Sequence, residues 1–146
     1  MRILLAGLVL CLALAGARAA PQGHWALREA SDGVRAGLVY PDYSPNEFAG
    51  LILSCMPGSP AVTVTTQVSP DLKQGQRVEV VIRADDRRAA YRARGRTSEL
   101  DGTVEAIFDT TLADPMLADL ANARTLVVTV GRATKPLPLG GAAFNN

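Results

Sequence analysis

The chain has 146 residues, of which 15 are basic and 14 acidic, and 48% of its residues are hydrophobic. This length accommodates one domain with a single hydrophobic core and excludes a core accompanied by a second folded unit. The nearly balanced charge excludes a protein that is basic as a whole, so any binding of polyanions would depend on a local cluster of charge.

The first 20 residues have the layout of a secretory signal peptide. Arg2 precedes the apolar run 3–15, and the small residues Ala17 and Ala19 follow it. This run is shorter than the roughly 20 residues of a membrane-spanning helix, which disfavours the alternative of a retained anchor. We therefore expect a mature domain over 21–146 with no transmembrane segment, located in the periplasm or secreted. The abundance of alanine and the excess of arginine over lysine are typical of a GC-rich bacterial genome.

Turn-forming residues recur roughly every eight to twelve residues, and short apolar or alternating stretches lie between them. This spacing is typical of an all-β sandwich or barrel, and we expect a two-sheet antiparallel β-sandwich of immunoglobulin-like size. The predicted strands are 25–29, 34–40, 48–55, 61–67, 77–84, 88–95, 102–110 and 126–130. A ninth, 134–139, contains two prolines that restrict it to a sheet edge or an irregular extended segment. The predicted core residues are Leu51, Leu53, Val62, Val64, Val78, Val80, Ile82, Tyr91, Val104, Phe108, Leu126 and Val128.

One segment departs from the strand pattern and predicts a short helix near 114–123. Asp114 is a helix-capping residue, and Pro115 follows it at the first helical position, where its missing N–H costs no hydrogen bond. Leu117 and Leu120 then fall on one helical face. We expect this helix to lie over one end of the sheets.

The stretch 83–96 contains six arginines and one tyrosine, which raises the question of a site for nucleic acid or another polyanion. With a two-residue turn at Asp85-Asp86, Val80 lies opposite Tyr91 and Glu79 lies opposite Arg92. A four-residue turn changes these partners but not the faces, because side chains alternate along a strand. Tyr91 therefore joins the apolar side, and the arginines point outward.

The next strand sets a second register. If residues 96 and 103 close a six-residue connection, Tyr91 lies opposite Phe108 and Arg94 lies opposite Glu105. Opposite charges on neighbouring strands contribute about 0.2–1 kcal/mol per pair. The same register thus satisfies both the core and the charges, so the arginine cluster is predicted as the solvated face of a three-stranded meander.

The outward arginines are nevertheless a candidate binding face, because more arginines point outward than acidic neighbours can pair. Nucleic acid is disfavoured, since single-strand binders stack bases on exposed aromatic rings, whereas Tyr91 faces the opposite side. The expected partner is a protein or an acidic envelope component such as lipopolysaccharide. The candidate binding residues are Arg83, Arg88, Arg92, Arg94 and Arg96.

No catalytic residue, metal site or cofactor is predicted. His24 is the only histidine and lies near the mature terminus, which is a poor position to hold a catalytic base. Zinc sites need several cysteine or histidine ligands, and the mature chain contains only His24 and Cys55. Cys55 ends an apolar strand, where free cysteine is typically a small buried hydrophobe. An intermolecular disulfide is the alternative.

Three segments of the second half together resemble a known family. They are DLKQGQ at 71–76, DPMLADL at 114–120 and PLPLGGAAF at 136–144. Their order resembles small exported proteobacterial proteins of the invasion-associated locus B type, over roughly residues 70 to 144. That family carries paired cysteines in its middle, which this chain lacks. The resemblance implies an exported β-sandwich acting at the cell envelope or in host contact, and it assigns no catalytic residue.

The leading functional hypothesis is an exported, non-enzymatic binding or accessory protein of the bacterial cell envelope, acting through a sheet face or an edge strand. The alternative is a small periplasmic hydrolase that uses carboxylate residues, because paired carboxylates can lie far apart in a sequence. A binding protein of the first kind should expose a flat face or edge. A hydrolase should show a pocket with convergent titratable groups.

Overall fold

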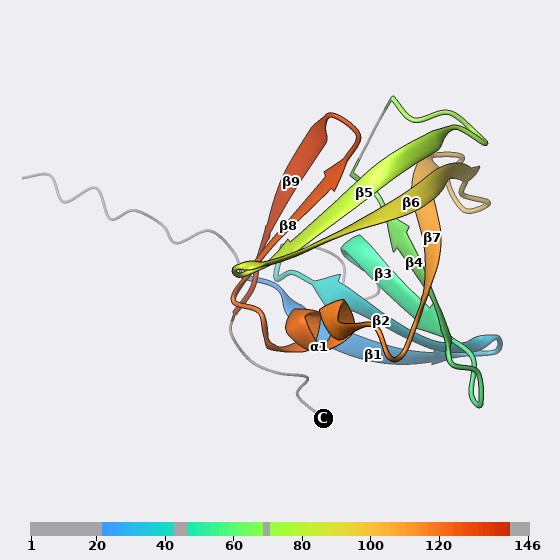
Figure 1. Ribbon diagram of the computed structural model, residues 1–146. Coiled ribbons are helices and arrows are strands. Elements are labelled where there is room, and N and C mark those ends of the chain that lie inside the picture. Colours follow the sequence, from blue (N-terminus) through green and yellow to red (C-terminus); the bar gives the residue numbers. More distant parts are fainter. Residues whose placement is uncertain (1–21, 43–46, 69–70, 141–146) are drawn as a thin grey trace, which may run out of the picture.

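The computed structural model describes residues 22–42, 47–68 and 71–140 (Figure 1). These residues form nine strands and one helix, which confirms the prediction of a predominantly β protein. The strands are β1 (His24–Ala30), β2 (Gly33–Val39), β3 (Ala49–Cys55), β4 (Ala61–Thr66), β5 (Arg77–Ala84), β6 (Arg87–Thr97), β7 (Val104–Thr111), β8 (Thr125–Val130) and β9 (Ala133–Pro138), and the helix is α1 (Pro115–Asn122). Each predicted strand overlaps one of these strands, and the predicted helix overlaps α1. The predicted signal peptide lies outside the described residues.

The nine strands of the described residues form one antiparallel sheet in the order β1-β2-β3-β4-β7-β6-β5-β8-β9. The predicted two-sheet sandwich is therefore not confirmed. Instead, the sheet rolls up until its first and last strands meet. The Gly23 N–H donates to the Pro138 carbonyl and the Gly140 N–H donates to the Gly23 carbonyl, both at 2.8 Å. The alternation of side chains along a strand predicts faces, but it does not predict which distant edges meet.

These two hydrogen bonds flank Leu139 and form a parallel bridge between Gly23 and Leu139 in an otherwise antiparallel sheet. The reason is the odd number of described strands, which makes the first and the last run in the same direction. The bridge joins only the start of β1 to the end of β9. As predicted, β9 is an edge strand of the sheet, where its prolines interrupt no continuous ladder on the outer side.

The core fills the inside of the rolled sheet. Of the predicted core residues, Leu51, Val62, Val64, Val80, Ile82, Phe108, Leu126 and Val128 are buried. The others, Leu53, Val78, Tyr91 and Val104, are partly buried and pack against that cluster. The inward period-two pattern thus predicted the core correctly. Trp25, Leu38 and Leu137, which were not predicted as core, are also buried; Trp25 and Leu137 come from β1 and β9, which close the sheet, and Leu38 comes from β2.

The hairpin of β5 and β6 has one of the two registers that the sequence left open. Val80 lies opposite Tyr91 and Glu79 lies opposite Arg92, so the turn is the two-residue turn at Asp85 and Asp86. Asp85 has a φ of 51°, in the left-handed region that aspartate tolerates better than most residues. Local alternation predicted the two faces of this hairpin, and the structure decides between the two turn lengths.

The register between β6 and β7 differs from the prediction by two residues. Arg96, not Arg94, lies opposite Glu105. The reason is that β6 continues to Thr97, and the loop 98–103 is closed by a 2.7 Å hydrogen bond from the Ser98 N–H to the Thr103 carbonyl. Because the shift is an even number of residues, every side chain keeps its predicted face.

The shifted register still brings Tyr91 to Phe108, although the two residues are not directly opposite. Their rings stack with centroids 4.3 Å apart and planes 15° apart. This diagonal contact on the inner face replaces the direct pair that was predicted.

Helix α1 begins at Pro115, as predicted, and the Asp114 carboxylate accepts a 2.9 Å hydrogen bond from the Met116 N–H. Met116 and Leu120 are buried beneath it. The indole N–H of Trp25 donates to the Leu120 carbonyl at 3.1 Å, which ties the end of the helix to β1. Within the described ranges, no helix has the length and apolar character needed to cross a membrane.

Candidate functional site

Six arginines point outward from β5 and β6, and we call them the basic face: Arg77, Arg83, Arg88, Arg92, Arg94 and Arg96. All six are exposed. Five of them are the predicted binding residues. Arg77 was placed on the same outer side by the strand alternation, but it lies outside the 83–96 cluster and was not chosen. Arg77 could have been chosen from the sequence, because it lies on the outer side of the strand predicted to pair with the strand 88–95.

The register of the hairpin places like charges against each other on this face. Arg83 lies directly opposite Arg88, and Arg77 lies directly opposite Arg94. Like charges in directly opposed positions destabilise a sheet. A merely solvated surface gains nothing from this arrangement.

The carboxylates near the basic face do not neutralise it through close ion pairs. Among the described residues, the ion pairs within 4 Å are Arg35 with Asp32 at 2.9 Å and Arg87 with Asp119 at 3.8 Å, and neither involves the basic face. The predicted pairing of Glu79 with Arg92 is confirmed in register only. Glu105 is buried and accepts a 2.9 Å hydrogen bond from the Gln67 amide instead.

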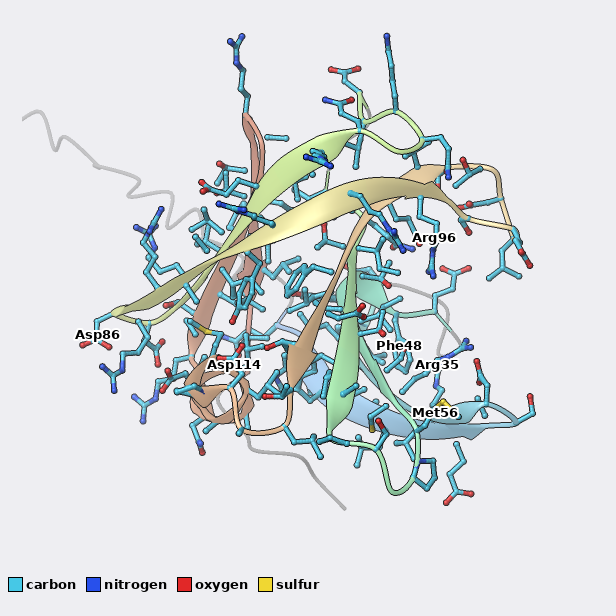
Figure 2. The ribbon with its side chains drawn as sticks, turned by 45° about the vertical axis from the view of Figure 1, so that its right-hand side comes forward. Arg35, Phe48, Met56, Asp86, Arg96 and Asp114 are labelled. Atoms are coloured by element: carbon cyan, nitrogen blue, oxygen red, sulfur yellow. The ribbon has the colours of Figure 1, made fainter. Side chains whose placement is uncertain are left out.

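The structure distributes the predicted binding residues over three hollows of the described surface. A hollow of about 870 Å³ is lined by Arg77, Arg92 and Arg94. A second, of about 440 Å³, is lined by Arg83 and Arg88. The third, of about 330 Å³, is lined by Arg96 and by Arg35 of β2, which lie on the same side of the molecule in Figure 2. The five residues therefore share one surface without forming one pocket.

The largest hollow lies where β6 separates from β7. The two strands pair only from Thr97 with Val104 to Arg94 with Ile107, whereas β7 remains paired to β4 along residues 106–111. Figure 1 shows the two strands diverging beyond this point, toward the end of the molecule where α1 lies. We call this opening the fork hollow.

The fork hollow has both apolar and charged lining residues. Val78, Ala93 and Phe108 line it from the inner face, where Phe108 is backed by the stacked ring of Tyr91. Ile107 is on the outer face, directly opposite Arg94. Two carboxylates, those of Glu79 and Asp109, line it together with its three arginines. Asp109 was not singled out from the sequence, because nothing local indicated that β7 would part from β6.

Asp109 and Glu79 are both exposed, and the hollow is open to solvent. The Thr63 hydroxyl on β4 donates a 2.7 Å hydrogen bond to the Asp109 carboxylate, which fixes its position at the side of the hollow. The arrangement supplies guanidinium donors and carboxylate acceptors around an apolar patch, and such a mixture recognises a ligand that carries both polar and apolar surface.

A separate carboxylate, Asp114, connects α1 to the two diverging strands. The Tyr91 hydroxyl of β6 and the Thr110 hydroxyl of β7 each donate to Asp114 Oδ2 at 2.7 Å, while Oδ1 caps the helix at the Met116 N–H. Figure 2 shows Asp114 beside the helix at the foot of β7. Asp114 therefore bridges two strands at a level where their backbones no longer pair.

These contacts perturb both partners of the Tyr91–Asp114 hydrogen bond. Burial opposes the charged form of Asp114, but the hydrogen bonds from Thr110, the Met116 N–H and Tyr91 outweigh it and hold the pKa of that carboxyl below its ordinary value. Burial first, and then the hydrogen bond and charge of Asp114, raise the pKa of Tyr91. The helix cap already accounts for the position of Asp114, so we interpret this cluster as structural.

An apolar cleft of about 160 Å³ lies between α1 and the inner face of β1 to β4. Trp25 and Cys55 line it, and so do Leu27 and Leu112, which are 56% and 60% exposed. Cys55, predicted as a small buried hydrophobe, is only partly buried and packs against the core, and among the described residues it is a free thiol. The cleft presents no charged side chain and offers no acid–base chemistry.

His24 is exposed at the start of β1. Among the described residues, no group of three or more histidine, cysteine or acidic side chains could hold a metal ion. Comparison with protein-family models, with curated proteins and with solved structures finds no match for this chain. The resemblance to the invasion-associated locus B type therefore stays a prediction.

Proposed function

We propose that the protein is an exported, non-enzymatic binding or accessory protein of the bacterial cell envelope, and that it binds an acidic partner through the basic face. The observation that carries this proposal is the pairing of arginine with arginine across the β5–β6 hairpin, at Arg83 with Arg88 and at Arg77 with Arg94. Such pairs cost stability, and a bound polyanion would remove the repulsion.

The shape of the face supports an extended partner rather than a small one. Its arginines line three separate hollows of the described surface. A single small anion would occupy one of these hollows, whereas a chain with repeated negative charges can contact them all. Once one unit of such a chain is bound, the neighbouring units are held close to the other hollows, so each further contact raises the overall affinity.

Export is proposed from the sequence of residues 1–20, whose layout is that of a cleavable signal peptide. The protein recovered from a cell fraction outside the cytoplasm should have an N-terminus near Pro21. A protein recovered in the cytoplasm with Met1 intact would contradict export.

The binding proposal is tested with heparin and with anionic lipid vesicles, comparing the native protein with the R88S/R92S/R94S variant. We expect the affinity to fall at least about tenfold, since each lost surface contact is worth up to about 1 kcal/mol. Binding of the native protein should also weaken as salt is raised, because salt screens exposed charges.

The matched control is R124S/R132S/K135S, which removes the same number of exposed positive charges outside the basic face. This control should bind like the native protein. Equal losses in both variants would show that only net charge matters, and unchanged binding by R88S/R92S/R94S would overturn the proposal.

A carboxylate hydrolase is the second candidate, because Glu79 and Asp109 line the same hollow. A hydrolase of this kind would cleave an acidic oligosaccharide and release new reducing ends, and the E79Q variant would abolish that release. A binding protein would return the oligosaccharide intact.

A further inference from the structure

The fork hollow combines charges that do not suit a simple anion. Arg77, Arg92 and Arg94 attract negative groups, but Glu79 and Asp109 line the same hollow and repel them. A ligand that carries only anionic acceptors, such as an inorganic polyphosphate chain, is attracted by the arginines and repelled by the two carboxylates. The hollow therefore selects for something more than negative charge.

The two carboxylates are hydrogen-bond acceptors when they are ionised, so their complement is a donor. Asp109 already accepts one hydrogen bond from Thr63, at 2.7 Å, and a carboxylate has further acceptor positions. A ligand with hydroxyl groups beside an anionic group can donate to Glu79 and Asp109 while its anion contacts the arginines. Alcohol hydroxyls and a carboxylate or sulfate on one small ring provide this combination.

The apolar lining gives the ligand a third requirement. Ile107 and Phe108 are 8% and 5% exposed, so they present limited apolar surface at the bottom of the hollow. Covering that surface is favourable for a ligand with a flat face of C–H groups. The volume of about 870 Å³ lies within the range of roughly 300–1,000 Å³ that is usual for ligand sites.

The neighbouring hollows continue the same surface in both directions. Glu79 lines both the fork hollow and the hollow that contains Arg83 and Arg88. On the other side, Thr63, whose hydroxyl donates to Asp109, lines the hollow that contains Arg96. A chain of repeated units seated in the fork hollow would therefore meet further arginines on either side.

We propose that the acidic partner is an anionic glycan and that the fork hollow holds one of its acidic sugar units, a uronate or a sulfated sugar. This inference rests on the proposed function, because it names the class of polyanion that the basic face binds. The arginines contact the acid group, Glu79 and Asp109 accept hydrogen bonds from ring hydroxyls, and Ile107 and Phe108 lie against the C–H face.

The test compares a short oligogalacturonate with an inorganic polyphosphate chain of the same number of charges, using calorimetry or fluorescence. The variant is E79Q/D109N, which removes both carboxylates while the Asn amide oxygen can still accept from Thr63. We expect oligogalacturonate to bind about tenfold more weakly, since losing one hydrogen bond to a charged group lowers an affinity by at least about tenfold. Polyphosphate should bind a few-fold more tightly, because the repulsion is gone.

The control is E29Q/D42N, which removes two exposed carboxylates from another part of the described surface and should change neither affinity. If E79Q/D109N binds both probes more tightly, the carboxylates act only by repulsion and the glycan assignment is overturned, while the proposed function stands. If the native protein binds neither probe, the proposed function fails together with the inference.

Discussion

Replacing Asp114 with alanine should destabilise the protein more than an ordinary helix-cap substitution does. The side chain accepts hydrogen bonds from the Met116 N–H at 2.9 Å and from the Tyr91 and Thr110 hydroxyls at 2.7 Å each. Loss of a helix cap costs about 1 kcal/mol. Hydrogen bonds to a charged group are worth about 1.5–3 kcal/mol.

Tyr91 and Thr110 are both partly exposed, so water can replace some of what they lose. We therefore assign about 1 kcal/mol to each of their hydrogen bonds, below the usual range for charged partners. With the cap, D114A should lower the free energy of unfolding by about 3 kcal/mol. Because globular domains are stable by only about 5–15 kcal/mol, this is a large fraction of the total.

The assay is urea unfolding followed by circular dichroism and by tryptophan fluorescence. Trp25 is the only tryptophan of the chain, and its indole N–H is bonded to the Leu120 carbonyl of α1, so its emission reports whether the helix stays docked. With a slope of about 1–3 kcal/mol per molar urea, the midpoint of D114A should fall by roughly 1–3 M.

A double-mutant cycle with Y91F separates this bridge from a simple cap. Y91F alone should cost about 1 kcal/mol, and D114A/Y91F should cost about 3 rather than 4 kcal/mol, because the shared hydrogen bond can be lost only once. A loss below about 1 kcal/mol in D114A, or additive losses in the double variant, would refute the interpretation of Asp114 as a bridge between β6, β7 and α1.

Two further predictions concern stability. The pKa of Asp114 is held below its unfolded value of about 3.9, so its contribution is fully present above that pH and is lost as pH falls through the folded pKa. The stability gap between the native protein and D114N should therefore be constant near neutral pH and narrow as the solution is acidified below pH ~3.9, and a gap that does not narrow in acid would contradict it. G50A should cost about 1–3 kcal/mol more than G58A, since both glycines have positive φ but a Cβ at Gly50 would lie 2.7 Å from Leu137 while one at Gly58 meets nothing within 4 Å. Thermal denaturation of the two glycine variants compares them directly, and equal losses would show that Leu137 does not pack tightly there.

Local patterns in the sequence predicted much of the fold. Alternation along the strands placed the core side chains inward, and the turn at Asp85-Asp86 predicted a hairpin of β5 and β6 with the observed faces. The cap at Asp114 and the proline after it predicted where α1 begins. Each of these depends on neighbours within a few residues, which a sequence displays directly.

The register of β6 against β7 needed information that the sequence does not display. The connection between them contains several residues that form turns, and the strand can end at more than one of them. The hydrogen bond from Ser98 to Thr103 selects one ending and moves the register by two residues. The side chains of β6 and β7 still point to their predicted faces, because the register is shifted by an even number of residues.

The sequence by itself determined the composition of the basic face, because alternation on a strand is enough to gather arginines on one side. Only the tertiary structure decided that β6 parts from β7, and hence that Arg92 and Arg94 share a hollow with Asp109. It also decided that Gly23 meets Pro138 and closes the sheet. Both depend on how far the sheet twists and curls, which is the sum of small rotations between all the strands and is recorded at no single residue.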